Sequence, residues 1–484
     1  MSKAKLARWL HLGHRWLGMG LGVMVLLWFV SGVVMLFVAR PQLTDQERLA
    51  GLPVIASDSV RISPLAAWHA LGLSGWPSAV RLNAADGRPA YRFLADKRWQ
   101  TVYADDASQP GMLDAKRAGE IALIHAGSAK IETIVAIDRD QWTVYRRFDT
   151  WRPFFRVELA NGRDFYVSQQ NHEVVLDTDW DERAWNWIGS VVHWLYFTPL
   201  RQHTQLWRNL VLWGSFASLL LALSGLWLGW QRLRWRQPYT GARVTPYRRG
   251  WKRWHHLLGL SGGLFVFTWL LSGWLSFAPF GLASGVSATP AERQLLAGGE
   301  LDAEALNVIP AIRPGSREFE WLRFAGQSLT LQHDAQAQLF LLGADGQMRP
   351  ALTPDEIRLA GQKLRPAANA TVDWLNEADS RYYPLRHTPR NFPVARLSFA
   401  DANQSVFYIA PDSGRIVLTT NRHDSAHRWL FRALHRLDIA PLVAQPWLRD
   451  GIIIALCLLG GGLSLSGCML GWRRLRHGRS GRGE

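Results

Sequence analysis

The second half of the sequence repeats the first half. Residues 223–234 return as residues 465–476, and both runs contain Leu-Ser-Gly followed by Leu-Gly-Trp. His193 returns as His435 at the same spacing of 242 residues, and His14 returns as His255 at a spacing of 241 residues. A period this long is typical of a duplicated domain, because solenoid repeats are only about 20–50 residues long. We therefore expect one fold built twice, in two tandem repeats.

Four apolar stretches are long enough to cross a membrane. They cover residues 17–38, 207–230, 257–279 and 451–472, and Arg208 is their only charged residue. A helix of about 20 apolar residues spans a hydrocarbon core of about 30 Å. The first stretch is not a cleaved signal peptide, because it lacks a small-x-small cleavage site and has a counterpart in mid-chain. The sequence predicts an α-helical membrane protein with four transmembrane helices and membrane lipid as a partner.

The net charge of +16 is confined to three short segments. Residues 1–16, 231–254 and 473–484 carry 17 basic residues and a single acidic residue, whereas the rest of the chain is neutral. These segments flank the apolar stretches, which is the positive-inside pattern of membrane proteins and not a surface for nucleic acid. The pattern predicts a multi-pass membrane protein with both termini and the middle loop in the cytoplasm; in a Gram-negative bacterium this membrane would be the bacterial inner (cytoplasmic) membrane. It excludes nucleic acid as a partner.

Two segments of equal length, residues 41–184 and 281–424, are expected in the periplasm. Their short β-rich runs and interrupting helices predict two α+β domains, each long enough for its own core. The expected strands are residues 91–94, 131–137, 142–148, 164–168, 174–177, 405–410 and 415–419, and the expected helices are residues 114–125 and a helix capped by Thr353. Both cysteines, Cys457 and Cys468, lie in the last apolar stretch, so these domains have no disulfide.

The chain is accordingly expected to have eight parts. Residues 1–40 form the cytoplasmic N-terminus and first transmembrane helix, 41–184 the first periplasmic domain, 185–232 an interfacial helix and the second transmembrane helix, and 233–254 a basic cytoplasmic loop. Residues 255–280 form the third transmembrane helix, 281–424 the second periplasmic domain, 425–474 an interfacial helix and the fourth transmembrane helix, and 475–484 the cytoplasmic tail.

Eight histidines lie near the ends of the apolar stretches, where an ionisable side chain is costly and usually functional. They are His11, His14, His255 and His256 at the cytoplasmic ends, and His193, His203, His427 and His435 at the outer ends. Any one of them could simply reach from the interface into water. Only His14, His255, His193 and His435 are present in both copies, so we expect these four to bind a cofactor. His11, His256, His203 and His427 are the weaker candidates.

Paired histidines on facing helices predict haem. Two imidazoles fill both axial positions of a six-coordinate haem iron, and the surroundings lack the carboxylates and thiolates of zinc or di-iron sites. One haem cannot serve both ends of a span about 30 Å long. We expect two non-covalent b-type haems, one held by His14 with His255 and one by His193 with His435. The alternative pairs His14 or His255 with His11 or His256. The residues placed to contact haem propionates or substrate are Arg15, Arg253, Arg432 and Arg436.

These residues resemble the PepSY-associated transmembrane family. The resemblance rests on the run from His427 to Asp438, which ends in His-Arg-Leu-Asp, and on the Leu-Ser-Gly run that follows it. It also rests on residues 391–397 and the hairpin at residues 407–417, which in this family belong to the outer PepSY domain. The first half is similar at residues 152–156 and 165–176 but has His193-Trp-Leu-Tyr instead of His-Arg-Leu-Asp. The resemblance implies two PepSY-like periplasmic domains.

Members of this family include di-haem inner-membrane reductases of ferric siderophores. The resemblance therefore implies an oxidoreductase that passes electrons outward, reduces a ferric siderophore or other ferric chelate, and releases Fe(II) for iron uptake. The sequence has no nucleotide-binding glycine motif, so the electron donor is expected to be a quinol or a cytoplasmic reductase. Two other functions stay open: haem electron transfer to another periplasmic acceptor, and a PepSY membrane protein that regulates or binds without haem.

Overall fold

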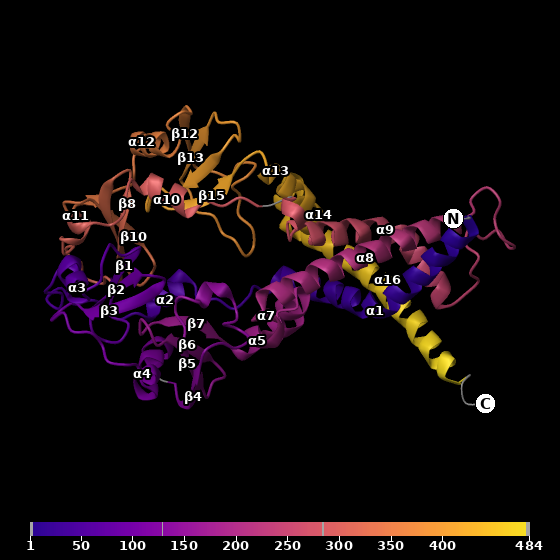
Figure 1. Cartoon of the computed structure of the whole chain (residues 1–484), viewed down its shortest axis with the longest axis horizontal. Helices are drawn as coiled ribbons and strands as arrows, with labels where there is room; N and C mark the ends of the chain where they lie inside the picture. The colour runs from indigo at the N-terminus through magenta and orange to yellow at the C-terminus, as the bar shows by residue number, and fades with distance from the viewer. Residues whose placement is uncertain (1–2, 128, 283–284, 481–484) are drawn as a thin grey trace. The chain divides into compact units, whose positions relative to one another are not determined.

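The computed structural model describes residues 3–127, 129–282 and 285–480. The chain divides into two compact units, and it enters each of them more than once. The helical unit consists of Met1–Arg40, Ala184–Gly285 and His423–Glu484, and the sheet unit consists of Pro41–Arg183 and Val286–Arg422. Figure 1 labels many of the elements of both units.

Four long helices form the helical unit (Figure 1): α1 (Lys3–Phe37), α8 (Thr204–Gln231), α9 (Trp251–Leu275) and α16 (Pro446–Ser480). Each is long and apolar enough to cross a membrane, which confirms the predicted spans. α1 packs on α8 and α16, and α9 packs on the same two helices, so the four helices form a closed ring. The buried core inside this ring includes Val25, Phe29, Leu219, Val266 and Cys457.

An interrupted helix lies shortly before each of α8 and α16. The first consists of α5 (Trp180–Asn186), the π-helical η2 (Trp187–Val191) and α6 (Val192–Trp194); the second consists of α13 (Asp424–His427), the π-helical η4 (Arg428–Ala433) and α14 (Leu434–Arg436). Each ends at a leucine in the left-handed region, Leu195 or Leu437, both with φ 52°. Turns of π-helix are frequent at functional sites. Each π segment here ends two residues before a predicted ligand, His193 or His435.

The sheet unit contains three antiparallel sheets. One has seven strands in the order β11-β10-β9-β8-β1-β2-β3, and the other two have the orders β4-β5-β6-β7 and β12-β13-β14-β15. The strands of the large sheet are β1 (Ala79–Asn83), β2 (Ala90–Ala95), β3 (Arg98–Tyr103), β8 (Glu318–Phe324), β9 (Gln327–His333), β10 (Leu339–Leu342) and β11 (Met348–Arg349). The others are β4 (Ile131–Ile137), β5 (Phe154–Leu159), β6 (Asp164–Ser168), β7 (Val174–Thr178), β12 (Ala370–Leu375), β13 (Val394–Phe399), β14 (Val406–Ile409) and β15 (Ile416–Thr420).

One helix packs against each four-stranded sheet, α4 (Ala115–Ala126) on the first and α12 (Pro354–Leu364) on the second. This confirms α+β architecture outside the spanning helices. Asp114 caps α4, and α12 begins with the expected capping box, in which Thr353 and Glu356 each bond the other's backbone N–H. The two helices therefore begin where the sequence predicts.

The expected strand at residues 142–148 is wrong. These residues form turns and the short helix η1 (Arg146–Phe148). The carboxylate of Asp140 accepts hydrogen bonds from the backbone N–H groups of Trp142 and Thr143, both at 3.0 Å. Such local bonds hold the chain in a turn and compete with a strand ladder, which a β-rich composition does not reveal.

Strands β1 and β8 join the two chain segments of the sheet unit in one sheet. They pair in antiparallel fashion, with Val80 opposite Trp321 and Leu82 opposite Phe319. Their side chains enter one hydrophobic core. This core also contains Tyr91, whose ring centroid lies 5.7 Å from that of Trp321. The pairing satisfies the backbone hydrogen-bonding groups of two strands that would otherwise lie at exposed sheet edges.

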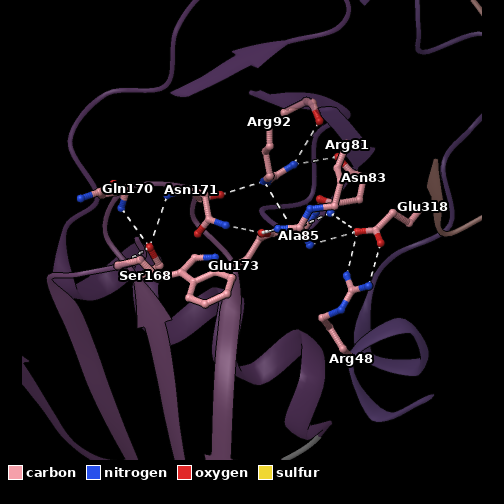
Figure 2. Close-up of polar contacts among 12 residues, drawn as sticks. Arg48, Arg81, Asn83, Ala85, Arg92, Ser168, Gln170, Asn171, Glu173 and Glu318 are labelled. Carbon is pink, nitrogen blue, oxygen red and sulfur yellow. Dashed lines mark hydrogen bonds and ion pairs between the residues drawn. The ribbon is translucent and has the colours of Figure 1, made fainter. Parts of the chain in front are cut away.

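A buried polar network lies beside this strand pair (Figure 2). Arg48 of α2 (Asp45–Gly51) donates two hydrogen bonds of 2.7 Å to the carboxylate of Glu318, which is fully buried. The Asn83 amide donates to both Glu318 and Glu173, at 2.8 and 2.6 Å. Burial alone would raise the pKa of Glu318, but the guanidiniums of Arg48 and Arg81 outweigh burial and hold the pKa well below its usual range. The two segments are thus joined by a charged contact as well as by a ladder.

Candidate functional site

The four duplicated histidines form two pairs in the helical unit. The rings of His14 on α1 and His255 on α9 have centroids 6.2 Å apart. The rings of His193 on α6 and His435 on α14 have centroids 6.4 Å apart. We call the first the basic-end pair, because the basic segments adjoin it, and the second the far-end pair. The structure thus brings together the residues of the preferred pairing.

A serine from a neighbouring helix contacts each ring of the basic-end pair. Nδ1 of His14 lies 3.2 Å from Oγ of Ser224, and Nδ1 of His255 lies 3.0 Å from Oγ of Ser466. The same nitrogens lie 3.1 and 3.3 Å from the backbone carbonyls of Leu221 and Leu463. The contact joins α1 to α8 and α9 to α16, so each ring is fixed by a helix other than its own.

The far-end pair has the same arrangement. Nδ1 of His193 lies 3.0 Å from Oγ of Ser31 on α1, and Nδ1 of His435 lies 3.0 Å from Oγ of Ser272 on α9. All four rings are therefore held at Nδ1 by a serine that is followed by glycine in the sequence.

The serines determine which ring nitrogen carries the proton. Each hydroxyl has one proton and donates it to a carbonyl of its own helix: Ser224 to Leu221, Ser466 to Leu463, Ser31 to Leu27 and Ser272 to Trp269. A hydroxyl that donates to this carbonyl accepts a hydrogen bond from the ring, and this arrangement favours a proton on Nδ1 and a lone pair on Nε2. Across the described residues, no hydrogen bond involves Nε2 of any of these four rings. A neutral imidazole oriented in this way is suited to bind a metal ion through Nε2, with the hydrogen bond at Nδ1 already made.

The glycine after each serine leaves room for the ring at the basic end. A Cβ at Gly225 would lie 2.7 Å from Cε1 of His14, and a Cβ at Gly467 would lie 3.2 Å from Cε1 of His255. Both distances are shorter than ordinary carbon contacts of about 3.5–4.0 Å. The Ser-Gly pair therefore has two roles here, since the serine orients the ring and the glycine lets it approach the helix.

The two pairs lie one membrane span apart. Helix α1 carries His14 of the basic-end pair and Ser31, which contacts the far-end pair, 17 residues later. At a rise of about 1.5 Å per residue, this separation is about 25 Å. The spacing from His255 to Ser272 on α9 is also 17 residues. The two pairs are therefore separate sites.

A cavity of about 1500 Å³ surrounds the basic-end pair. Its apolar walls include Val25, Leu226, Leu270 and Met469. Its charged lining residues are all basic: Arg15, Arg232, Arg249, Lys252, Arg473, Arg474 and Arg476. The cavity is thus suited to a partly apolar group that bears negative charges.

In each pair, the separation of the ring centroids matches the separation expected for two imidazoles that share one metal ion. A metal–nitrogen bond of about 2 Å, with each ring centroid about 1 Å behind its nitrogen, places two opposed imidazole centroids about 6 Å apart. The observed 6.2 and 6.4 Å agree with this value. The free Nε2 atoms and, at the basic end, the cavity with cationic lining also fit a six-coordinate haem iron.

The other predicted histidines do not form pairs of this kind. His11 and His256 line the same cavity, where Nε2 of His11 lies 3.3 Å from Arg232 and Nε2 of His256 lies 3.0 Å from the carbonyl of Gly229. His203 is exposed at the start of α8. The ring of His427 lies against Phe431, with centroids 5.3 Å apart and the planes tilted by 42°, and its Nδ1 lies 3.9 Å from Asp424.

The predicted arginines have different surroundings. Arg15 lines the cavity, and its Nε is buried without a hydrogen-bond partner among the described residues. Arg253 is not part of the lining and donates to the carbonyl of Arg248 at 3.2 Å. At the far end, Arg432 lies 3.6 Å from Asp424 and Arg436 lies 3.7 Å from Asp438. Of the four, Arg15 is the one that the structure brings to a cavity beside a histidine pair.

One cluster in the sheet unit has the composition of a metal site. Glu318, Glu320 and His333 offer ligand atoms within 4.8 Å of one another. Arg48 occupies both carboxylate oxygens of Glu318, and Arg415 forms an ion pair with Glu320. These guanidiniums supply the positive charge that a metal ion would bring, so the cluster is an ion-pair network.

The sequence gives little sign of the serines as ring partners. The Ser-Gly pairs recur in both halves and could be found as repeats, but their distance from the histidines along the chain is 162 to 211 residues. Contacts over such separations depend on how the helices pack, which a repeat pattern alone does not specify.

Comparison with known proteins gives one family. The model described as the PepSY-associated TM region matches residues 9–474, which is nearly the whole chain. No curated protein matches the chain.

Proposed function

The chain belongs to the family of the PepSY-associated TM region, and from this premise we propose that it is a haem-containing membrane oxidoreductase that reduces Fe(III) in ferric siderophores. Electrons cross the membrane from the cytoplasmic side to the periplasmic side, where Fe(II) is released. The proposal includes two b-type haems, one at each histidine pair.

One observation carries this proposal. Two histidine pairs lie at opposite ends of the helix ring, and in each pair the ring centroids have the separation expected for two ligands of one metal ion. His14 and His255 would hold one haem iron, and His193 and His435 the other. The serine at each Nδ1 keeps Nε2 free for the iron and makes the ring more basic. Arg15, which lines the cavity beside the basic-end pair, would pair with a propionate.

The proposed orientation follows from charge. The basic segments favour a cytoplasmic position for the basic-end pair in a bacterial inner membrane, with the far-end pair at the periplasmic face. The sheet unit would then lie in the periplasm and consist of two PepSY-like domains, one from each tandem repeat. In keeping with a repeat, a helix followed by a four-stranded sheet occurs in both halves, as α4 with β4–β7 and α12 with β12–β15.

Reduction is a sufficient means of releasing iron from a chelator. Hard oxygen ligands bind Fe(III) tightly and bind the softer Fe(II) more weakly. Adding a single electron to the iron therefore weakens the complex. When bound, haem supplies one-electron chemistry that side chains lack. The protein then needs only to position the electron near the chelate, without a general acid or a hydrolytic site.

Dithionite-reduced protein is expected to transfer electrons to a ferric hydroxamate or catecholate siderophore. The test mixes the two anaerobically with an Fe(II) trap and follows the haem spectrum. Reoxidation of haem, matched one to one by trapped Fe(II), is the expected result. Haems that stay reduced with every ferric siderophore, yet reoxidise with another acceptor, would favour electron transfer to that acceptor. A purified protein without a haem spectrum would favour a regulatory or binding role.

Replacing Ser272 with alanine is expected to raise the reduction potential of the far-end haem. The lost hydrogen bond to Nδ1 of His435 makes the ring less basic, and a less basic ligand stabilises ferric iron less. A hydrogen bond of about 1 kcal/mol corresponds to roughly 40 mV for one electron. Spectroelectrochemical titration measures this shift. Ser261→Ala is the matched control, since Ser261 lies on the same helix and bonds only carbonyls of that helix; an equal shift in both variants would contradict the role of Ser272.

A further inference from the structure

The cavity at the basic end is larger than one planar cofactor needs. Pockets that enclose a drug-sized ligand have volumes of about 300–1,000 Å³. The cavity has about 1500 Å³, and its lining extends from His14 and His255 between the helices to the exposed residues Lys252 and Arg474. A second planar molecule could therefore lie between the haem and the cytoplasm.

The charge of the cavity also exceeds what one haem can balance. Seven arginine and lysine side chains line it, and no described lining residue is acidic. Two propionates would neutralise two of these charges. Glu484 is the single acidic residue of the three basic segments, so the sequence supplies almost no local counter-charge. The remaining positive charge is concentrated at the exposed mouth, which we define as Arg249, Lys252, Arg473, Arg474 and Arg476.

We propose that this mouth binds the electron donor, and that the donor is a reduced flavin nucleotide whose phosphate contacts Lys252 and Arg474. The inference rests on the proposed function, because it names the donor for the same electron path. It assigns the donor to a concave, cationic site that also has aromatic lining from Tyr247, Trp251 and Trp472.

The lining favours an anionic planar donor over the other classes. A quinol headgroup is neutral, so it would gain little from a cluster of guanidiniums. A redox protein would meet the surface of the mouth but could not enter a cavity between helices. A flavin nucleotide combines a planar ring, which aromatic side chains can stack, with a phosphate, which arginine and lysine bind strongly. Anionic lipid headgroups share the phosphate chemistry and are the competing occupant.

Electron transfer from the reduced flavin to haem balances in electrons and protons. A dihydroflavin loses two electrons and two protons when it becomes the oxidised flavin. The electrons leave one at a time and reduce two ferric centres to ferrous, and the protons pass to cytoplasmic water. No further oxidant or reductant is required for the step.

Binding of flavin mononucleotide tests the site without electron transfer. Full-length protein in nanodiscs of neutral phosphatidylcholine is titrated with oxidised flavin mononucleotide and, separately, with riboflavin, which lacks the phosphate. Flavin fluorescence anisotropy or quenching reports binding. We expect the nucleotide to bind about tenfold more tightly than riboflavin at low salt, with the advantage falling as salt is raised.

A double substitution with a matched control locates the site. Lys252→Glu with Arg474→Glu is expected to remove the tenfold preference for the nucleotide, because both residues lie at the mouth. Arg8→Glu with Arg236→Glu makes the same charge change on exposed residues that do not line the cavity, and it is expected to keep the preference. Equal binding of nucleotide and riboflavin, or equal effects of both double substitutions, would overturn the proposal.

Two further arms separate the competing occupants. Nanodiscs with anionic lipid are expected to weaken nucleotide binding only severalfold; complete loss would assign the mouth to lipid. In anaerobic mixing, reduced flavin mononucleotide is expected to reduce the haems of the wild-type protein faster than the haems of the mouth variant. The donor assignment would be overturned if the flavin reduced neither protein and a soluble quinol reduced both equally fast. A protein without haem would refute the proposed function and leave the flavin-binding result intact.

Discussion

The His435→Ala variant is expected to bind about one haem per protein instead of two. A b-type haem is held only by its axial ligands and its packing, so losing one of two ligands empties the far-end site. The basic-end pair lies about 25 Å away along α1 and α9 and should be unaffected. The pyridine haemochrome assay gives the haem-to-protein ratio. His427→Ala is the matched control, because His427 lies eight residues earlier in the same interrupted helix and pairs with no other histidine among the described residues.

Double substitutions make this result specific to the pairing. His193→Ala with His435→Ala should still leave about one haem, because both rings belong to one site. His14→Ala with His435→Ala should leave almost none, because each site loses a ligand. Full haem content in both single variants, His193→Ala and His435→Ala, would refute the far-end site. One remaining haem in the His14 and His435 double variant would instead indicate that His11 or His256 replaces His14.

The Arg48→Met variant is expected to lower the free energy of unfolding of the sheet unit by about 3–5 kcal/mol. The change leaves the carboxylate of Glu318 fully buried with its main counter-charge removed, and an unpaired buried charge is strongly destabilising. Urea unfolding of the full-length protein, followed by protease cleavage within residues 41–183 and 286–422, measures the change. Arg358→Met removes an exposed ion pair with Asp355 and should change it by less than about 0.5 kcal/mol.

The pH dependence of this difference has a definite sign. In the wild type, the guanidiniums outweigh burial and depress the pKa of Glu318, so its stabilising contribution is complete near neutral pH and is lost as the pH falls below about 4.5. In Arg48→Met, burial dominates and raises the pKa, so the folded variant takes up a proton and gains stability as the pH falls. The gap between the two proteins should therefore narrow from pH 7 to pH 4. A constant gap would show that Glu318 is not the source of the loss.

The sequence was most informative where a local pattern determines the structure. Continuous apolar runs predicted the four spanning helices, and the Thr353 to Glu356 capping box predicted the start of α12. The duplication also selected four histidines from eight near the span ends, and these are the four that the structure pairs. Periodicity, capping and repetition are all properties of neighbouring or equivalent residues, and for this reason they can be read directly.

The remaining features depend on contacts between distant segments. The contact of Ser272 with His435 spans 163 residues, and the pairing of β1 with β8 joins segments more than 200 residues apart. The π-helical turn before His435 packs against α9, and its sequence resembles that of an ordinary amphipathic helix. The incorrect strand prediction at residues 142–148 has a local cause instead. The carboxylate of Asp140 accepts hydrogen bonds from nearby backbone N–H groups and holds the chain in a turn.

Each histidine pair takes one ring from either half of the chain, and this has a consequence for how such a protein could arise. A polypeptide with one copy of the repeat could build both sites only as a symmetric dimer, with identical residues facing each other across the axis. Fusing two copies in one chain removes that constraint, because each half can then change alone. The sequence already differs in this way around the basic-end pair, where His11 stands opposite Lys252 in the repeat and Arg15 opposite His256. Fusion thus permits the residues around one histidine of a pair to change while those around the other stay the same.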